Sequence, residues 1–289
     1  MHTAKPMIVY AAAKLNLTLD ILGRRPDGYH LLDMVMQTVS IYDTLMLTPT
    51  QHLGIELFCD RDGIPCGKDN TVQKAARLFY QQAGITSAGI RIQMLKRIPD
   101  QAGMGGGSAD AAAILRAMNR IYKTGFTLEQ LCELGLQIGA DVPFCLRGGT
   151  MRAEGIGEVL TPLPSMPSCY FVVCKPEVSV STAAAFAQAD RDGAAYPHFT
   201  PAMLAALKIG ELPRIADCLG NSFTLALPLP QIEQLRQAFL TMGALGACMT
   251  GSGSAVFGIF SERISSEHCR EELRKTYQHV FVCEPAGAE

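Results

Sequence analysis

The sequence lacks the features that would place it in a membrane or on a nucleic acid. None of its apolar runs reaches the roughly 18 residues that a membrane-spanning helix needs. The apolar run ahead of Lys14 is too short for a convincing signal peptide. A formal net charge of −2 gives no overall basic field of the kind that sequence-independent nucleic-acid binding uses. We therefore expect a cytoplasmic protein with no membrane partner and no nucleic-acid partner.

Paired-cysteine motifs are also missing, although the chain has ten cysteines. There is no C-x-x-C pair and no cluster of His and Cys at zinc spacing, so reduced and mostly buried thiols are favoured over a disulfide or a structural metal site. The composition, with 48% hydrophobic and 18% charged residues, is that of an ordinary globular protein. Its 289 residues favour two domains over one.

What the sequence does contain is a glycine-rich stretch, "PDQAGMGGGSADAAAIL", at 99–115. The run "IRIQMLKRI" before it predicts a strand, and apolar residues at helical spacing from Ala109 predict a helix after it. Glycines between a strand and a helix allow main-chain N–H groups to approach an anion at the helix N-terminus. The alternative is a plain strand-to-helix turn.

The better-known phosphate-binding motifs do not fit this stretch. A Walker A loop needs a lysine after the glycines, and here Ser108 follows them directly. A dinucleotide fingerprint needs glycine at the position of Ser108 and an acidic residue about twenty positions later. The H-R-D and D-F-G segments of protein kinases do not occur. What remains is a loop whose amides cradle phosphates while the Ser108 hydroxyl reaches a Mg²⁺ ion bound to them.

Around the loop, the first half of the chain predicts a mixture of strands and helices. Residues 13–22 alternate as a half-buried strand, which places Lys14 and Asn16 side by side on its polar face. A turn-rich loop, "GRRPDGYH", separates this strand from a second one. Asp69 or Asn70 would cap one helix, and Thr127 with Gln130 forms a capping box for another, after which "GADVPFCLRGGT" reads as irregular.

The second half of the chain has the element order of a ferredoxin-like unit. The predicted order is strand, helical region, strand, strand, helix and strand, with the turn "TGSGS" at 250–254 between the two middle strands. A proline-rich connector, "TPLPSMP", precedes the first of these strands. We therefore predict an N-terminal domain at 1–160 and a C-terminal domain at 161–289.

Four segments in this order resemble the galactokinase, homoserine kinase, mevalonate kinase and phosphomevalonate kinase (GHMP) superfamily. They are the glycine-rich stretch, "MTGSGSAVFGIF", "GADVPFCLRGGT" and the opening "AKLNLTLDILGRRPDGYHLLDMVMQTV". The resemblance covers nearly the whole chain. It implies an α+β fold, in which a ribosomal-protein-S5-domain-2-like N-terminal domain and a ferredoxin-like C-terminal domain enclose the active site in a cleft. The chain departs from the family pattern at Met104, where leucine is usual, and at Ala109, where a second serine is common.

The resemblance implies a small-molecule kinase that uses ATP and Mg²⁺. Asp141 would be the catalytic base and Lys14 would hold it ionised, while Asn70 and Lys96 would line the adenine and ribose side. The implied ATP-binding loop consists of Pro99, Asp100, Gln101, Ala102, Gly103, Met104, Gly105, Gly106, Gly107, Ser108 and Ala109.

The opening segment is most similar to a family branch of the non-mevalonate isoprenoid route. That branch transfers the γ-phosphoryl group of ATP to the C2 hydroxyl of a cytidine-diphosphate-linked methylerythritol. Tyr29 would then stack on the pyrimidine, His30 would bond its polar edge, Phe186 would close the other side and Asn16 would contact the methylerythritol. Another GHMP acceptor (homoserine, mevalonate or a sugar) and a non-catalytic nucleotide binder are the alternatives. The sequence leaves open whether the protein is a monomer or a homodimer.

Each of these residues also has a purely structural interpretation. Asp141 would be a loop or cap residue, Lys14 a solvated strand lysine, Asn70 a helix cap, Lys96 a solvated strand end and Phe186 a core residue. The segment from Gly251 to Ser254 would approach the substrate or the phosphates with its main-chain amides, or it would be a hairpin turn.

Overall fold

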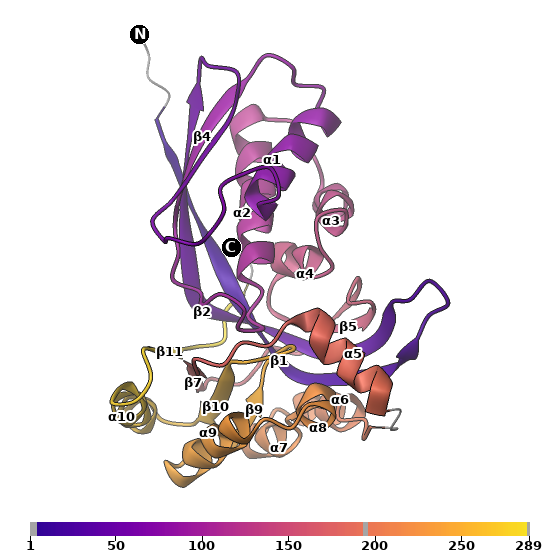
Figure 1. The fold of residues 1–289 in the computed structure, drawn as a ribbon, viewed down its shortest axis with the longest axis vertical. Coiled ribbons are helices and arrows are strands. Elements are labelled where there is room, and N and C mark those ends of the chain that lie inside the picture. The colour runs from indigo at the N-terminus through magenta and orange to yellow at the C-terminus, as the bar shows by residue number, and fades with distance from the viewer. Residues whose placement is uncertain (1–4, 193–195, 288–289) are drawn as a thin grey trace.

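The computed structural model describes residues 5–192 and 196–287, which form two sheets flanked by helices (Figure 1). In this part of the chain the first sheet has seven strands and the second has four. The strands are β1 (Met7–Arg24), β2 (His30–Thr50), β3 (Gly54–Cys59), β4 (Gly89–Leu95), β5 (Thr150–Gly155), β6 (Val159–Pro162), β7 (Tyr170–Lys175), β8 (Gly220–Asn221), β9 (Gly246–Met249), β10 (Val256–Phe260) and β11 (His279–Cys283). The helices are α1 (Thr71–Gln82), α2 (Gly106–Tyr122), α3 (Leu128–Leu136), α4 (Val142–Arg147), α5 (Thr182–Asp192), α6 (Thr200–Ile209), α7 (Leu212–Asp217), α8 (Ser222–Ala226), α9 (Pro230–Thr241) and α10 (Arg263–Arg274).

The first sheet is built around the long antiparallel pair β1 and β2, and helices α1 to α3 lie on one of its faces (Figure 1). Both strands extend well beyond the runs that alternation predicted. The polar face of β1 is buried, with Lys14 exposed by 4% and Asn16 by 1%. A solvated Lys14 is therefore wrong, because Gly105 and Asp141 lie against it. Segments from the second half of the chain pack on the rest of this face. One of them is α6, whose first amide is capped by the buried carboxylate of Asp20.

The predicted elements around the glycine-rich stretch are present. Strand β4 leads into the stretch, and α2 begins at Gly106, three residues before the predicted start. Asn70 caps α1 by accepting from the Val72 amide. The capping box of Thr127 and Gln130 at α3 is confirmed.

The segment at 139–150 is not irregular throughout, because α4 runs from Val142 to Arg147. Its apolar residues are buried, and Pro143 stands in the first turn, where a helix does not need the missing N–H. The sequence had predicted an irregular segment bounded by Pro143 and two glycines. The burial that stabilises such a short helix comes from the rest of the fold.

The second sheet has the order β11-β7-β10-β9 and is antiparallel throughout, with α9 and α10 packed beside it (Figure 1). This is the predicted ferredoxin-like arrangement. The chain leaves the first sheet after Pro162 and enters the second at Tyr170, and we propose the domain boundary at this connector. Strand β8 nevertheless returns to the first sheet, where Gly220 pairs with Thr18, so the two halves of the chain interleave.

Among the helices of residues 5–192 and 196–287, none combines the length and the hydrophobicity that crossing a bilayer would take. All ten cysteines are unpaired, and several are fully buried.

Candidate active site

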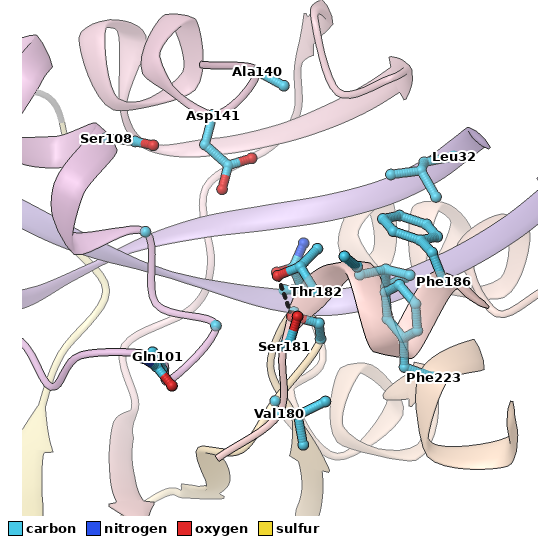
Figure 2. A pocket seen from close by; sticks show the side chains of 18 of the residues that line it. Leu32, Gln101, Ser108, Ala140, Asp141, Val180, Ser181, Thr182, Phe186 and Phe223 are labelled. Carbon is cyan, nitrogen blue, oxygen red and sulfur yellow. Dashed lines mark hydrogen bonds between the residues drawn. The ribbon is translucent and has the colours of Figure 1, made fainter. Parts of the chain in front are cut away.

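A pocket of about 1130 Å³ is lined by β1, β2, the glycine loop (residues 99–105), the start of α2 and the start of α5. The turn at 250–254, here called the second glycine turn, also contributes to its wall. Figure 2 shows Ser108 and Asp141 at one end of the pocket and Leu32, Phe186 and Phe223 at the other. The volume exceeds the roughly 300–1,000 Å³ of most single-ligand sites, so two ligands can lie side by side.

Two glycines of the glycine loop stand where a side chain would not fit. Gly103 has a φ of +72°, and a Cβ on it would overlap the carbonyl oxygen of Thr250. Gly105 has a φ of +70°, and a Cβ there would lie 3.0 Å from Cγ of Lys14. The loop is therefore pressed between β1 and the second glycine turn, and only glycine permits this approach.

The first turn of α2 faces the pocket without a side-chain cap. Gly105 is the N-cap residue and has no side-chain oxygen, so the first amides of α2 receive no side-chain hydrogen bond from the cap position. Gly106, Gly107 and Ser108 all line the pocket. Uncapped amides at a helix N-terminus favour a bound anion, which is the chemistry that phosphates supply.

Thr250 joins the second glycine turn to the rest of the site. Its buried hydroxyl accepts a hydrogen bond from the backbone amide of Asn16 at 3.0 Å and donates one to the backbone carbonyl of Gly103 at 3.2 Å. Asn221 donates from its side-chain amide to the carbonyls of Met249 and Gly251, each at 2.8 Å. These bonds hold β1, the glycine loop and the second glycine turn together as one rigid wall.

Lys14 and Asp141 form an ion pair at the edge of this wall, with Nζ and Oδ2 3.6 Å apart. The Lys14 ammonium also donates to Oδ1 of Asn16 at 2.6 Å. The lysine side chain is 5% exposed and the aspartate side chain 32% exposed, so the carboxylate is the partner that faces the pocket. Asp141 stands at the N-cap position of α4 but makes no capping hydrogen bond, which excludes the helix-cap interpretation.

The opposite end of the pocket is aromatic. The ring centroids of His30 and Phe186 are 4.3 Å apart with an interplanar angle of 14°, and Phe223 meets Phe186 edge-on at 4.9 Å. His30 Nε2 lies 2.7 Å from Oδ1 of Asp190, whose other oxygen is 3.3 Å from Arg24. The hydrogen bond from His30 holds the pKa of Asp190 below its usual range, and the charge of Arg24 adds to this effect. Tyr29 also lines this end and is 60% exposed.

Two family patterns match the chain. The "GHMP kinases N terminal domain" family matches residues 70–149 and the "GHMP kinases C terminal" family matches residues 203–279. Together they span more than half of the sequence. The chain belongs to the GHMP kinases.

Curated relatives of this GHMP kinase match over nearly their full length. A 4-diphosphocytidyl-2-C-methyl-D-erythritol kinase of Clostridium kluyveri is 39% identical over 279 residues, which is 96% of this chain and 99% of that one. The enzyme of the same name from Pelotomaculum thermopropionicum is 42% identical over 280 residues, covering 94% of this chain and 95% of that one.

Solved structures agree with these sequence matches. A crystal structure of 4-(cytidine 5'-diphospho)-2C-methyl-D-erythritol kinase superposes with a TM-score of 0.83 at 33% identity and covers 97% of this chain and 100% of that chain. A homoserine kinase from Cytophaga hutchinsonii has a TM-score of 0.76 at 20% identity, with coverage of 99% and 96%, and shares the fold.

Most of the site residues predicted from the sequence line the pocket described above. The pocket residues of β1 and β2 are far in sequence from those of the glycine loop and of α5. Only the fold brings these segments together. The nominated residues on the pocket wall are Lys14, Asn16, Tyr29, His30, Pro99, Asp100, Gln101, Ala102, Gly103, Met104, Gly105, Gly106, Gly107, Ser108, Asp141 and Phe186.

Three nominated residues lie off this wall. Ala109, in the first turn of α2, is 2% exposed and packs in the core. Asn70 is used as the cap of α1. Lys96 is 4% exposed and pairs with the buried carboxylates of Asp43 and Asp110.

The surroundings of Lys96 instead anchor the start of the glycine loop. Asp43 accepts from the backbone amides of Arg97 at 2.5 Å and Ile98 at 2.9 Å while it also pairs with Lys96. Burial would lower the pKa of Lys96, but the charges of Asp110 and Asp43 raise it above its ordinary value. Burial raises the pKa of Asp110 to about 7, although the charge of Lys96 opposes the shift.

One ring face of Phe186 is covered by His30 in this structure. The imidazole of His30 lies parallel to its ring at 4.3 Å, and a third ring does not fit between two rings at that spacing. His30 and Phe186 therefore form one unit in this structure, and the exposed ring beside that unit is Tyr29.

Sequence reasoning missed Thr250, Asp190 and the contact of Thr182 with Ser252, whose hydroxyl oxygens are 2.8 Å apart. Thr250 opens the segment "TGSGS", which the sequence singled out only for its glycines. Asp190 carries no local signal, because its partner His30 is 160 residues away.

Proposed function

We propose that this GHMP kinase transfers the γ-phosphoryl group of ATP to the C2 hydroxyl of 4-diphosphocytidyl-2-C-methyl-D-erythritol. The products are ADP and the 2-phosphate, within the non-mevalonate route of isoprenoid precursor biosynthesis. The observation that carries this proposal is the match, over nearly full length and at 39–42% identity, to curated kinases of that name. The large pocket, with an anion-binding end and an aromatic end, supports it.

The glycine loop and the first turn of α2 would hold the phosphates of ATP. Their amides approach the pocket closely because Gly103 and Gly105 carry no side chain. Phosphoryl transfer makes few covalent demands on the protein and depends on positioning and charge neutralisation. The hydrogen bonds of Thr250 support this role, because they keep the loop fixed against β1.

The residues present fit a Mg²⁺ ion that arrives with ATP. Mg²⁺ keeps several waters and takes one or two protein oxygens together with substrate phosphates. In the described residues no group of three or more His, Cys, Asp or Glu side chains could hold a metal. Ser108 faces the pocket and would supply a protein oxygen (Figure 2). When bound, the ion would neutralise charge on the transferring phosphoryl group.

Asp141 would accept the proton of the acceptor hydroxyl late in the transfer. A tertiary alcohol is too weakly acidic to be deprotonated in advance by a carboxylate, so the proton would move as the bond to phosphorus forms. The nearby Lys14 ammonium favours the ionised carboxylate and places positive charge beside the attacking oxygen. Asn16, which bonds Lys14 from the same strand, would meet the methylerythritol end of the acceptor.

Tyr29 and His30 would receive the cytosine at the far end of the pocket. The exposed ring of Tyr29 offers a stacking face, and His30 offers a polar edge. This pocket end argues against homoserine, mevalonate and sugars as acceptors, since none of them carries a base to stack. We further propose that the protein works in the cytoplasm as a monomer or homodimer; its unpaired cysteines support a reducing compartment.

An ADP-release assay with purified protein tests the proposal. Turnover is expected with ATP, Mg²⁺ and the diphosphocytidyl acceptor, and it should stop when EDTA removes the metal. Homoserine, mevalonate and galactose serve as competing acceptors, and a preference for one of them would overturn the acceptor assignment. Binding of ATP without turnover on any acceptor would instead identify a non-catalytic nucleotide binder.

A further inference from the structure

One face of α5 forms part of the pocket wall. Ala183, Phe186, Ala187 and Asp190 line the pocket, and they follow one another at the spacing of a single helix face. Phe186 and Asp190 are one turn apart, so their side chains point in the same direction. Both of them contact the same residue, His30, at the start of β2.

The His30 ring is held from two directions. Phe186 covers its face in a parallel stack, and Asp190 holds its Nε2 edge at 2.7 Å. The His30 side chain is consequently only 9% exposed, although it lines the pocket. A stack alone would let the ring turn in its own plane, whereas a stack with an edge hydrogen bond fixes its orientation.

Asp190 also determines which nitrogen of His30 carries the proton. An ionised carboxylate can only accept a hydrogen bond, so the Nε2 atom that faces it must carry the hydrogen. Asp190 stays ionised because the His30 hydrogen bond lowers its pKa, with Arg24 3.3 Å from its other oxygen. In the neutral ring Nδ1 is then left as an acceptor, and it has no hydrogen-bond partner within residues 5–192 and 196–287.

We propose that Asp190 is a positioning residue that fixes the tautomer of His30 and thereby selects an amino-pyrimidine over an oxo-pyrimidine. The inference rests on the proposed function, in which a pyrimidine lies at this end of the pocket. The exocyclic amine of cytosine donates a hydrogen bond to an acceptor nitrogen, whereas the corresponding carbonyl of uracil presents a second lone pair to it. A site built to pair one polar group discriminates strongly against the analogue that leaves it unpaired.

The test compares kcat/KM for the diphosphocytidyl acceptor with that for its diphosphouridyl analogue. Wild type is expected to prefer the cytidyl compound, and Asp190→Ala should reduce this preference by about tenfold. The loss should come from KM for the cytidyl acceptor, while kcat and KM for ATP stay within about twofold. An unchanged preference in Asp190→Ala would overturn the proposal.

A double-mutant cycle with His30→Ala separates positioning from general support of the pocket. If Asp190 acts through His30, the double variant should show the same preference as His30→Ala alone. Independent, additive losses would show that Asp190 acts by another route and would overturn the proposal.

Arg191→Ala is the matched control, because Arg191 is the next residue of α5 and, among the residues that the structure describes, its side chain is bonded to Gln188 on the same helix. It should leave the preference unchanged, and a loss equal to that of Asp190→Ala would overturn the proposal. Thermal melting of each variant checks that it is folded. Failure of wild type to phosphorylate the cytidyl acceptor would count against the proposed function, whereas normal wild-type turnover with an unaltered Asp190→Ala preference would count against this inference alone.

Discussion

The side chains of Lys14, on β1, and Asp141, immediately before α4, meet with their charged atoms 3.6 Å apart. The lysine ammonium donates a hydrogen bond to Asn16, and the carboxylate of Asp141 faces the pocket. The pair thus has a fixed, buried cation and a reachable base, which is the arrangement that transfer to a weakly acidic hydroxyl needs.

Replacement of Asp141 by Asn should lower kcat by about 10²–10⁴-fold, the usual contribution of a general base. The Kd for ATP, measured by calorimetry, should change by less than about threefold, because the phosphates would lie on the glycine loop. Asp217→Asn, at an exposed position at the end of α7, is the control and should behave as wild type. A large loss of ATP affinity with normal turnover would contradict the role assigned to Asp141.

A comparison of two glycines tests whether close packing of the glycine loop matters for ATP. Gly103 and Gly125 have the same φ of +72°, but a Cβ would overlap the Thr250 carbonyl at the first and meet nothing within 4 Å at the second. Gly103→Ala should raise KM for ATP by about tenfold or more. Gly125→Ala should leave this KM unchanged and lower the stability by the backbone strain alone, about 1 kcal/mol. Equal kinetics for the two variants would refute the packing argument.

Loss of the Tyr29 ring should weaken binding of the acceptor. Stacking on a base contributes about 1–3 kcal/mol, so Tyr29→Ala should raise KM for the diphosphocytidyl acceptor by about 5–150-fold with little change in kcat. The melting temperature should stay near that of wild type, since the side chain is 60% exposed. Tyr29→Phe keeps the ring and serves as the control. An unaltered KM in Tyr29→Ala would mean that the ring is not a base platform.

Lys96→Met should destabilise the protein, because it leaves the buried carboxylates of Asp43 and Asp110 without their cation. Breaking a buried pair by removing one partner costs about 3–5 kcal/mol. The expected result is a clear fall in the melting temperature, with a smaller effect on ATP affinity at temperatures where the variant remains folded. Lys175→Met, at a half-exposed strand end, is the control. Wild-type stability with a selective loss of ATP binding would restore Lys96 to the nucleotide site.

Asp110 should make the stability of the protein depend on pH. Burial raises its pKa to about 7 in the folded state from an ordinary value of 3.8, so the folded protein binds the proton more tightly than the unfolded chain does. Its contribution to the free energy of unfolding is therefore complete below about pH 4 and is lost as the pH rises through about 7.

The Asp110→Asn variant removes this titration and is compared with wild type by thermal melting between pH 5 and pH 8. The melting temperature of wild type should fall relative to that of the variant as the pH increases. A difference that is constant with pH would show that Asp110 is already ionised in the folded protein at pH 5.

Local physical chemistry let the sequence predict the elements on which the site is built. The strand alternation of β1, the cap at Asn70, the capping box at Thr127 and the strand–glycine–helix order around Gly105 all depend on neighbouring residues. The order of the later elements likewise predicted the ferredoxin-like sheet. Family resemblance, and not spacing, nominated the pairing of Lys14 with Asp141.

The tertiary structure decided everything that depends on contacts between distant segments. It placed Lys96 in a buried ion pair with Asp43, which lies on a neighbouring strand that sequence spacing cannot place. It also brought Asp190 to His30 and Thr250 to Gly103. The sequence by itself thus determined which segments are strands, helices and phosphate-type loops, because those depend on local backbone preferences. Burial and charge pairing between segments, which determine what each polar side chain does, exist only once the chain has folded.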